Sequence, residues 1–168
     1  MRYLVIFVLG VFLPIVAVIA LGLSGLLPIH ATAAPSWIES KIAGSAMDAR
    51  LEREARGLQN PLKPTDEVLL AGMKSYRNGC VGCHGGARGP SAWGTKNFYP
   101  RAPQFAQEGT DMSEPEMFLV VKHGVRYTGM AAWDGLIPEQ EMWQVVTFLS
   151  RIKNLPPAVA AAWTAPPA

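Results

Sequence analysis

The stretch NGCVGCHGG, residues 78–86, contains both cysteines of the chain and a histidine directly after the second one. A Cys-x-x-Cys-His pattern has three competing interpretations: a redox dithiol, half of a zinc site, or the attachment point of a covalent haem. Because the 168-residue chain has no other cysteine, the pair does not belong to the disulfide framework of a small secreted domain. If the two thiols have a chemical role, they therefore act together at this one site.

The surroundings of the pair disfavour the first two interpretations. A redox dithiol sits at the N-terminus of a helix in a fold with strands, whereas here a helical pattern precedes the pair and Gly-Gly follows it. Zinc needs four ligands, and His84 is too close to the pair to be an easy third. The other histidines are His30, beside the apolar N-terminus, and His123. The spacing instead suits two thioether bonds to one side of a porphyrin, with His84 carried under the iron.

The N-terminus contains an apolar run from Leu4 to Leu27, long enough as a helix to span a bilayer core of about 30 Å. The alternative is a cleaved signal peptide, with Ala-Thr-Ala at 31–33 as the cleavage site and Arg2 as its positive end. The run exceeds the roughly 7–15 apolar residues of a signal peptide, so we predict that residues 1–29 are an uncleaved anchor. In both cases the chain after the run is exported, and Arg2 stays in the cytoplasm.

Residues 30–64 are predicted to form a spacer that contains one helix, residues 36–57. Ser36 and Glu39 have the spacing of a capping box, and residues 48–56 mix charges of both signs. This pattern predicts a solvated helix that holds the next domain away from the membrane. The alternative is a docking helix for a partner subunit.

Residues 65–153 are predicted to form an all-α domain with three main helices. The first begins at Thr65 and runs into the cysteine pair, the second begins with a capping box at Ser113, and the third is opened by Pro138. Residues 82–111 are rich in Gly and Pro and show no periodicity. So long a loop is uncommon in a compact domain unless another body fills the space, and a haem is such a body.

Composition excludes several functions. The net charge of +2 is too small to indicate a nucleic-acid partner. No Ser/His/Asp set, carboxylate dyad or phosphate loop stands out, so we expect neither an enzyme nor a small-molecule substrate. Residues 154–168, NLPPAVAAAWTAPPA, are rich in Pro and Ala and predict a mobile tail, with docking of Trp163 on another surface as the alternative.

Residues 65–153 resemble a class I c-type cytochrome. The stretches that carry the resemblance are LLAGMKSYRNGCVGCHG at 69–85, VVKHGVRYTGMAAW at 120–133 and PEQEMWQVVTFLSRIK at 138–153. The resemblance covers about half of the chain and implies one haem c. By that resemblance Cys80 and Cys83 form the thioethers, and His84 and Met130 are the axial ligands of the iron.

The choice of Met130 is supported by the positions of the other methionines. Three of them, Met73, Met117 and Met142, fall on apolar helix stripes, where core packing is the default role. Met112 precedes a helix and is the one competitor. Met130 follows Gly129 in the loop between the last two helices, in a TGMAAW setting that matches the ligand loop of the family.

The resemblance also implies weaker assignments. Pro90 matches the position whose carbonyl accepts the Nδ1 proton of the proximal histidine. Tyr76 and Gly72 match the crossing of the first and last helices, opposite residues such as Phe148. Side chains that line the haem or pair with its propionates are expected among Trp93, Lys96, Arg101 and Trp133, although Lys96 and Arg101 equally suit plain surface charges. The family has no ligand at the position of His123.

The function implied is one-electron transfer by a single-pass protein of the cytoplasmic membrane, with the haem domain on the periplasmic side. Its partners are then the membrane and a redox donor and acceptor. The alternative is a permanent subunit of a respiratory, photosynthetic or dehydrogenase complex. Residues 59–153 carry 10 basic and 9 acidic side chains, which gives little long-range steering and mildly favours a tethered role. A haem enzyme or gas sensor would require that Met130 does not bind the iron.

Overall fold

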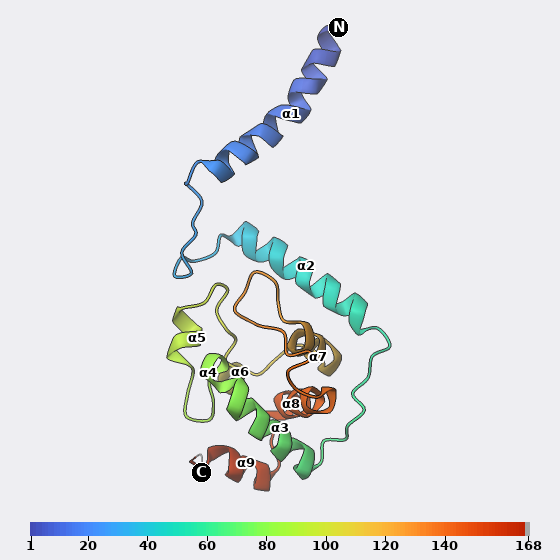
Figure 1. The fold of residues 1–168 in the computed structure, drawn as a ribbon, viewed down its shortest axis with the longest axis vertical. Coiled ribbons are helices and arrows are strands. Elements are labelled where there is room, and N and C mark those ends of the chain that lie inside the picture. Colours follow the sequence, from blue (N-terminus) through green and yellow to red (C-terminus); the bar gives the residue numbers. More distant parts are fainter. Residues whose placement is uncertain (167–168) are drawn as a thin grey trace. The chain divides into compact units, whose positions relative to one another are not determined.

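The computed structural model describes residues 1–166, and all regular secondary structure in that range is helical (Figure 1). The prediction of an all-α protein is therefore confirmed. The chain divides into two compact units, Met1–Ala33 and Ala34–Ala168, which are described separately.

The first unit contains one long helix, α1 (Arg2–Leu23), with exposed apolar side chains along its length. Among the described residues it is the one helix that is long and apolar enough to cross a membrane, a test that an N-terminal signal sequence also passes. It ends at Leu23, earlier than the apolar run, which continues to Leu27. An N-terminal helix of this kind is compatible with membrane anchoring.

The second unit begins with α2 (Trp37–Ala55), the helix predicted for the spacer. The Ser36 side chain accepts a hydrogen bond from the Glu39 amide, as a capping residue does. The Glu39 carboxylate lies beside the Tyr99 hydroxyl, and this hydrogen bond is the main reason that the pKa of Tyr99 is raised to about 12. α2 packs against α7, with Leu51 buried, so the spacer helix is attached to the domain that follows it.

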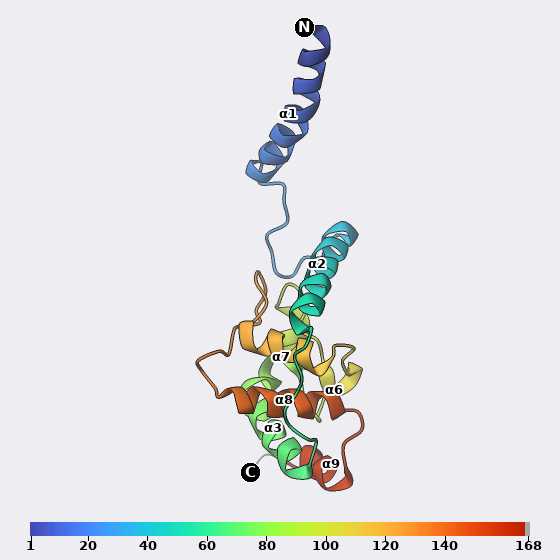
Figure 2. The same ribbon diagram turned by 90° about the vertical axis from the view of Figure 1, so that its right-hand side faces the viewer.

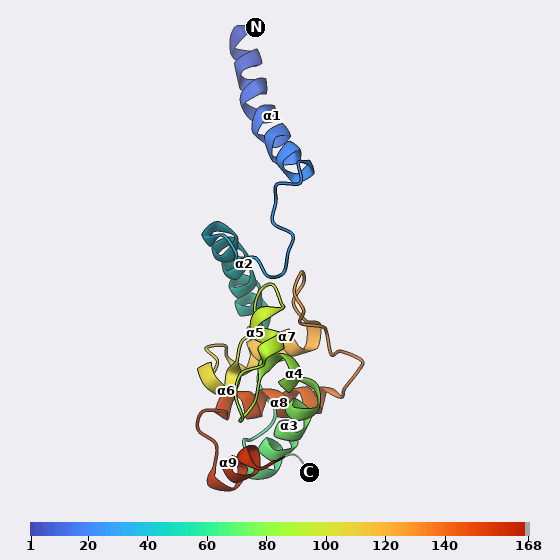
Figure 3. The same cartoon turned by 90° about the vertical axis from the view of Figure 1, so that its left-hand side faces the viewer.

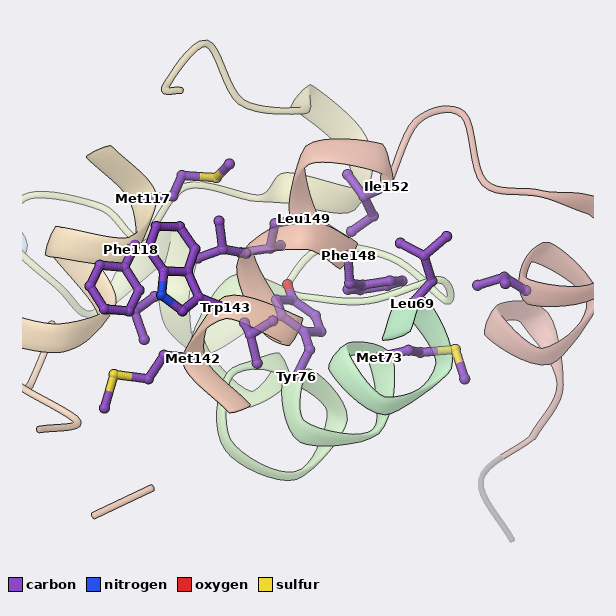
Figure 4. Packing of buried hydrophobic residues seen from close by; sticks show 14 of the residues in the cluster. Leu69, Met73, Tyr76, Met117, Phe118, Met142, Trp143, Phe148, Leu149 and Ile152 are labelled. Carbon is purple, nitrogen blue, oxygen red and sulfur yellow. The ribbon is translucent and has the colours of Figure 1, made fainter. Parts of the chain in front are cut away.

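The core of the second unit is the crossing of α3 (Asp66–Gly79) with α8 (Glu139–Arg151). Gly72 permits the close approach, because a Cβ atom there would lie 2.0 Å from the Gln144 carbonyl oxygen. Beside it the rings of Tyr76 and Phe148 are 5.7 Å apart, and both side chains are fully buried (Figure 4). The crossing predicted for Gly72, Tyr76 and Phe148 is confirmed.

The second of the three predicted main helices is α7 (Glu114–His123), which packs on α8 (Figure 2). The predicted capping box is present: Ser113 and Glu116 bond each other's backbone. Between the two helices the Phe118 and Trp143 rings stack at 3.9 Å. Gly124 ends α7 with φ 65°, a conformation that favours glycine.

The long loop after the cysteine pair is less irregular than expected. It contains two short helices, α5 (Ala92–Lys96) and α6 (Phe105–Glu108), and it follows a third, α4 (Val81–His84) (Figure 3). These helices have five residues or fewer, too short to produce a periodic apolar pattern in the sequence.

The prediction of a mobile tail is wrong for the part of it that the structure describes. Residues Pro157–Thr164 form α9, which packs on α3. Val159 is fully buried and Trp163 is 8 % exposed, so both belong to the core. The final two residues of the predicted tail, 167 and 168, lie outside the described residues.

Candidate haem-binding site

The cysteine pair lies where α3 passes directly into α4. Cys80 caps the end of α3, and α4 carries Cys83 and His84. The amides of Cys83 and His84 both donate to the carbonyl oxygen of Cys80, at 3.1 and 2.9 Å. A single helical turn therefore holds both thiols and the imidazole on one short segment.

Both cysteines are unpaired and half-buried. Burial, and then the neighbouring Cys83, raises the pKa of the Cys80 thiol to about 11. A redox dithiol needs a depressed pKa, so that the reactive thiolate is present near neutral pH. Cys80 has the opposite property, and this disfavours the dithiol interpretation on physical grounds.

The His84 ring is oriented by two contacts from the loop that follows. Its Nδ1 atom lies 2.9 Å from the Pro103 carbonyl oxygen, and the ring stacks on Phe105 with centroids 4.9 Å apart. Burial lowers the pKa of His84. A neutral imidazole that donates from Nδ1 keeps the lone pair of Nε2 for a metal.

The carbonyl that bonds His84 corrects one assignment. The resemblance gave this role to Pro90, whereas the structure gives it to Pro103. Pro90 instead lies near Gly85, within 2.9 Å of the position that a Cβ atom on that glycine would take. The loop doubles back between the two prolines, and only its folded course decides which carbonyl reaches the imidazole.

Gln104 and Gly94 fix the loop around Cys83. The buried Gln104 side chain donates to the carbonyl oxygens of Cys83 and Ala102, at 3.0 and 2.7 Å, and accepts from the Ser91 amide at 2.7 Å. A Cβ atom on Gly94 would lie 1.8 Å from the Cys83 carbonyl oxygen. The backbone around the second cysteine is therefore enclosed by the loop.

Tyr76 connects the helix crossing to this loop. Its hydroxyl donates to the carbonyl oxygen of Gly85 at 2.8 Å and lies 3.2 Å from that of His84. Burial is the main cause that raises the pKa of Tyr76, so the hydroxyl stays protonated and remains a donor. The structure thus gives Tyr76 a place beside the site as well as in the core.

Met130 lies in the loop between α7 and α8. The Val125 amide donates to its carbonyl oxygen at 3.0 Å, and its own amide donates to the Thr128 hydroxyl at 3.0 Å. The side chain is half-buried against the core cluster. A Cβ atom on the preceding Gly129 would be 2.3 Å from the Phe98 ring, so this loop lies against the one that follows the cysteine pair.

The competitor Met112 has a similar backbone setting but different neighbours. Its amide donates to the Thr110 hydroxyl at 3.2 Å, and its side chain is also half-buried against the core. Met130 differs from Met112 in its neighbours. Its loop packs against Phe98, in the segment that follows the cysteine pair, and continues to Trp133, whose ring lies beside Gly79.

The weaker candidates differ in their relation to the site. The Trp133 ring lies 2.5 Å from the position of a Cβ atom on Gly79, directly before the cysteine pair. Trp93 is 57 % exposed and packs edge-on against Phe98 at 4.6 Å. Arg101 donates to the carbonyl oxygens of Lys96 and Phe98, so its side chain stabilises the loop to which it belongs.

Sequence reasoning missed Gln104, Pro103 and Gly94. A glutamine in a Gly- and Pro-rich stretch gives no local signal of burial, and Gly94 is one of 16 glycines. Their roles depend on contacts between segments that are distant along the chain.

The residues present fit a haem c. Two unpaired thiols, a neutral imidazole with Nε2 available and a half-buried thioether donor are the groups that such a cofactor requires. Together with the all-helical fold they define a class I c-type cytochrome domain.

The particular family follows from comparison with known proteins. Residues 67–149 match the family model described as "Cytochrome C oxidase, cbb3-type, subunit III", which is consistent with a class I c-type cytochrome domain in this part of the chain. A comparison with curated proteins and one with solved structures each gave no match. A domain of this family supports electron transfer through a haem.

Proposed function

We propose that the protein is a membrane-anchored one-electron carrier with a single haem c, attached through Cys80 and Cys83 and ligated by His84 and Met130. The observation that carries the proposal is the hydrogen bond between His84 Nδ1 and the Pro103 carbonyl, because it orients an imidazole beside two unpaired thiols. Such a haem, with both axial positions filled, supplies one-electron transfer and no open site for a substrate.

The protein's own residues then have separate tasks. The turn from Cys80 to His84 presents the three attachment groups on one segment, and Gln104 fixes the backbone behind Cys83. Burial keeps His84 neutral and therefore able to bind a metal. The Thr128 hydroxyl holds the backbone of Met130.

Covalent attachment is tested on the full chain, produced in cells that mature c-type cytochromes. We expect haem to stay with the polypeptide after denaturation and acid–acetone extraction. Cys80→Ser and Cys83→Ser should each retain one bond or none, as judged from the mass and the pyridine haemochrome spectrum. A colourless polypeptide from the parent chain would refute the proposal.

The distal ligand is tested by the matched variants Met130→Leu and Met112→Leu. Loss of the sulfur ligand should lower the reduction potential and open the iron to carbon monoxide, because a thioether favours Fe(II) and occupies the sixth position. We expect this in Met130→Leu and a parent-like response in Met112→Leu. The reverse result would transfer the ligand role to Met112, and rapid carbon monoxide binding by the parent chain would leave Met130 without that role.

We propose the periplasmic side of the cytoplasmic membrane for the haem domain. The support is the apolar helix α1 followed by a chain that carries an exported type of cofactor site. Treatment of spheroplasts with an impermeant protease should digest the domain without lysis. Protection until the cells are lysed would reverse the orientation.

A second candidate function is that of a permanent subunit of a terminal oxidase. The match of residues 67–149 to a family named for subunit III of a cbb3-type oxidase favours it. Extraction in mild detergent followed by sizing separates the two functions. A carrier runs alone, whereas a subunit runs with other chains and with oxidase activity.

A further inference from the structure

The helix α9 lies outside the residues that match the family, yet it is built into the core of the domain. The match ends at residue 149, and α9 spans Pro157–Thr164. Helices of eight residues are unstable alone, so α9 depends on its contacts with the rest of the domain. Those contacts lie on α3, the helix that leads into the cysteine pair (Figures 1 and 3).

Arg77 attaches the end of α9 to α3. Its guanidinium donates to the carbonyl oxygens of Ala162, Trp163 and Ala165, at 2.9, 2.7 and 3.2 Å. It also lies over the Trp163 ring, 5.4 Å from the centroid. The last carbonyls of a helix lack partners within the helix and carry partial negative charge, so a cationic donor satisfies them.

Trp163 then reaches the segment that follows His84. Its ring packs edge-on against Tyr76 and Phe148, with centroids 5.8 and 5.2 Å away. Its outer edge lies 3.6 Å from the position of a Cβ atom on Gly86. The Tyr76 ring, which packs against Trp163, carries the hydroxyl that donates to the carbonyl oxygen of Gly85.

We propose that Trp163 is a positioning residue for the proximal haem ligand, an inference that rests on the proposed function. It restrains the backbone of residues 84–86 from two directions, through Tyr76 and because its ring edge borders Gly86. Because this backbone carries the His84 ring, a rigid backbone fixes the geometry of the bond between Nδ1 and Pro103. That bond sets how strongly the imidazole donates to the iron. Trp163 thus couples a helix beyond the family domain to the reduction potential.

The test uses the full-length, haem-loaded protein in detergent and the variants Trp163→Ala, Trp163→Phe and Met117→Ala. Met117 is a buried core residue of α7, so its truncation is a control for loss of core packing alone. Two quantities are measured besides thermal stability: the reduction potential and the hydrogen exchange of the Gly85 and Gly86 amides. Both amides are hydrogen-bonded, to Val81 and Gly89, so their exchange reports local opening.

We expect Trp163→Ala to shift the reduction potential and to speed exchange at Gly85 and Gly86 by about tenfold, since its two aromatic contacts, with Tyr76 and Phe148, are lost. Trp163→Phe keeps an aromatic ring at this position, so its reduction potential and its exchange rates should lie close to the parental values. Met117→Ala should lower stability and leave the potential and the two local exchange rates unchanged. The proposal is overturned if Trp163→Ala lowers stability while both local readouts stay at parental values.

If Trp163→Ala does not accumulate, Arg77→Met provides the same test, because it releases the end of α9 and keeps the tryptophan. An unchanged potential and unchanged exchange in that variant would equally overturn the proposal. The failure of the proposed function is distinguishable, since the parent chain would then carry no covalent haem. Exchange at Gly85 and Gly86 would still be measurable.

Discussion

The two segments that supply the proposed iron ligands, α4 with His84 and the loop with Met130, differ in how they are held. The backbone from Cys83 to Gly85 accepts hydrogen bonds from two side chains outside its own segment, Tyr76 and Gln104, and the His84 ring is bonded to the Pro103 carbonyl. The backbone of Met130 is held within its own loop, by Val125 and Thr128. The proximal segment is therefore tied by hydrogen bonds to residues outside it, whereas the hydrogen bonds of the Met130 backbone stay within its own loop.

This difference has a physical consequence for the proposed cofactor. A ligand fixed by long-range contacts moves only when the core moves, whereas a ligand held by local bonds opens at a lower free-energy cost. We therefore expect changes on the proximal side to affect folding and haem attachment. Changes on the distal side should affect mainly how tightly the sixth position is closed.

The largest effect is expected for Gly94→Ala. The new Cβ atom would meet the Cys83 carbonyl oxygen at 1.8 Å, and this backbone atom cannot rotate away. We expect a loss of about 3 kcal/mol or more in the free energy of unfolding, measured with denaturant. The distal counterpart is Gly129→Ala, whose Cβ atom meets the Phe98 side chain, and it should cost about 1 kcal/mol. Equal losses would remove the distinction between the two sides.

Next in size is Gln104→Leu. It leaves the Cys83 and Ala102 carbonyl oxygens and the Ser91 amide without this partner, and we expect a cost of about 2 kcal/mol. Gln107→Leu is the control, because that exposed side chain makes a single bond, to the Gly86 carbonyl. Denaturant unfolding of both variants measures how much more the free energy of unfolding falls in Gln104→Leu than in Gln107→Leu. If Gln104→Leu left the free energy of unfolding unchanged, the hydrogen bonds of Gln104 would not be needed to stabilise the segment around Cys83.

A smaller effect is expected for Thr128→Val, which removes the acceptor of the Met130 amide and a donor to Val125. The cost to overall stability should be about 1 kcal/mol, and carbon monoxide should bind the reduced protein faster than it binds the parent. Thr110→Val removes the same kind of bond from Met112 and serves as the matched control. Faster binding in the Thr110 variant alone would place the distal ligand at Met112.

The smallest effect concerns the cap of α7, the helix that leads into the distal loop. Hydrogen bonds from Ser113 lower the pKa of Glu116. Because the folded pKa is depressed, the stabilisation is present above the ordinary carboxyl pKa and is lost as the pH falls through the lowered value. Glu116→Gln should therefore cost at most about 1 kcal/mol at pH 7 and converge with the parent as the pH falls through the lowered pKa of Glu116. Glu67→Gln, in the first turn of α3, is the control, and a stability difference that persists after the Glu116 carboxyl is protonated would contradict this account.

Much of the fold was predictable because its signals are local. Thr65 and Ser113 cap the helices that begin after them, as expected, and Gly124 ends α7. The crossing of Gly72 with α8 followed from the resemblance, and the Cys-x-x-Cys-His pattern located the site. The Pro/Ala tail gave no comparable signal, since α9 is short and alanine-rich and its burial depends on Arg77 and Tyr76.

The sequence by itself determined the three main helices of the domain and the segment that bears the thiols and the imidazole, because caps, apolar periodicity and motif spacing act over a few residues. Three contacts were decided only by the tertiary structure. The Pro103 carbonyl, and not that of Pro90, bonds the His84 ring; the Gln104 side chain donates to the Cys83 carbonyl; and the Trp163 ring packs against Tyr76. Each of these joins residues that are far apart in the chain. Which partners meet is set by how α3, α8 and the loop pack together, and no local pattern records that.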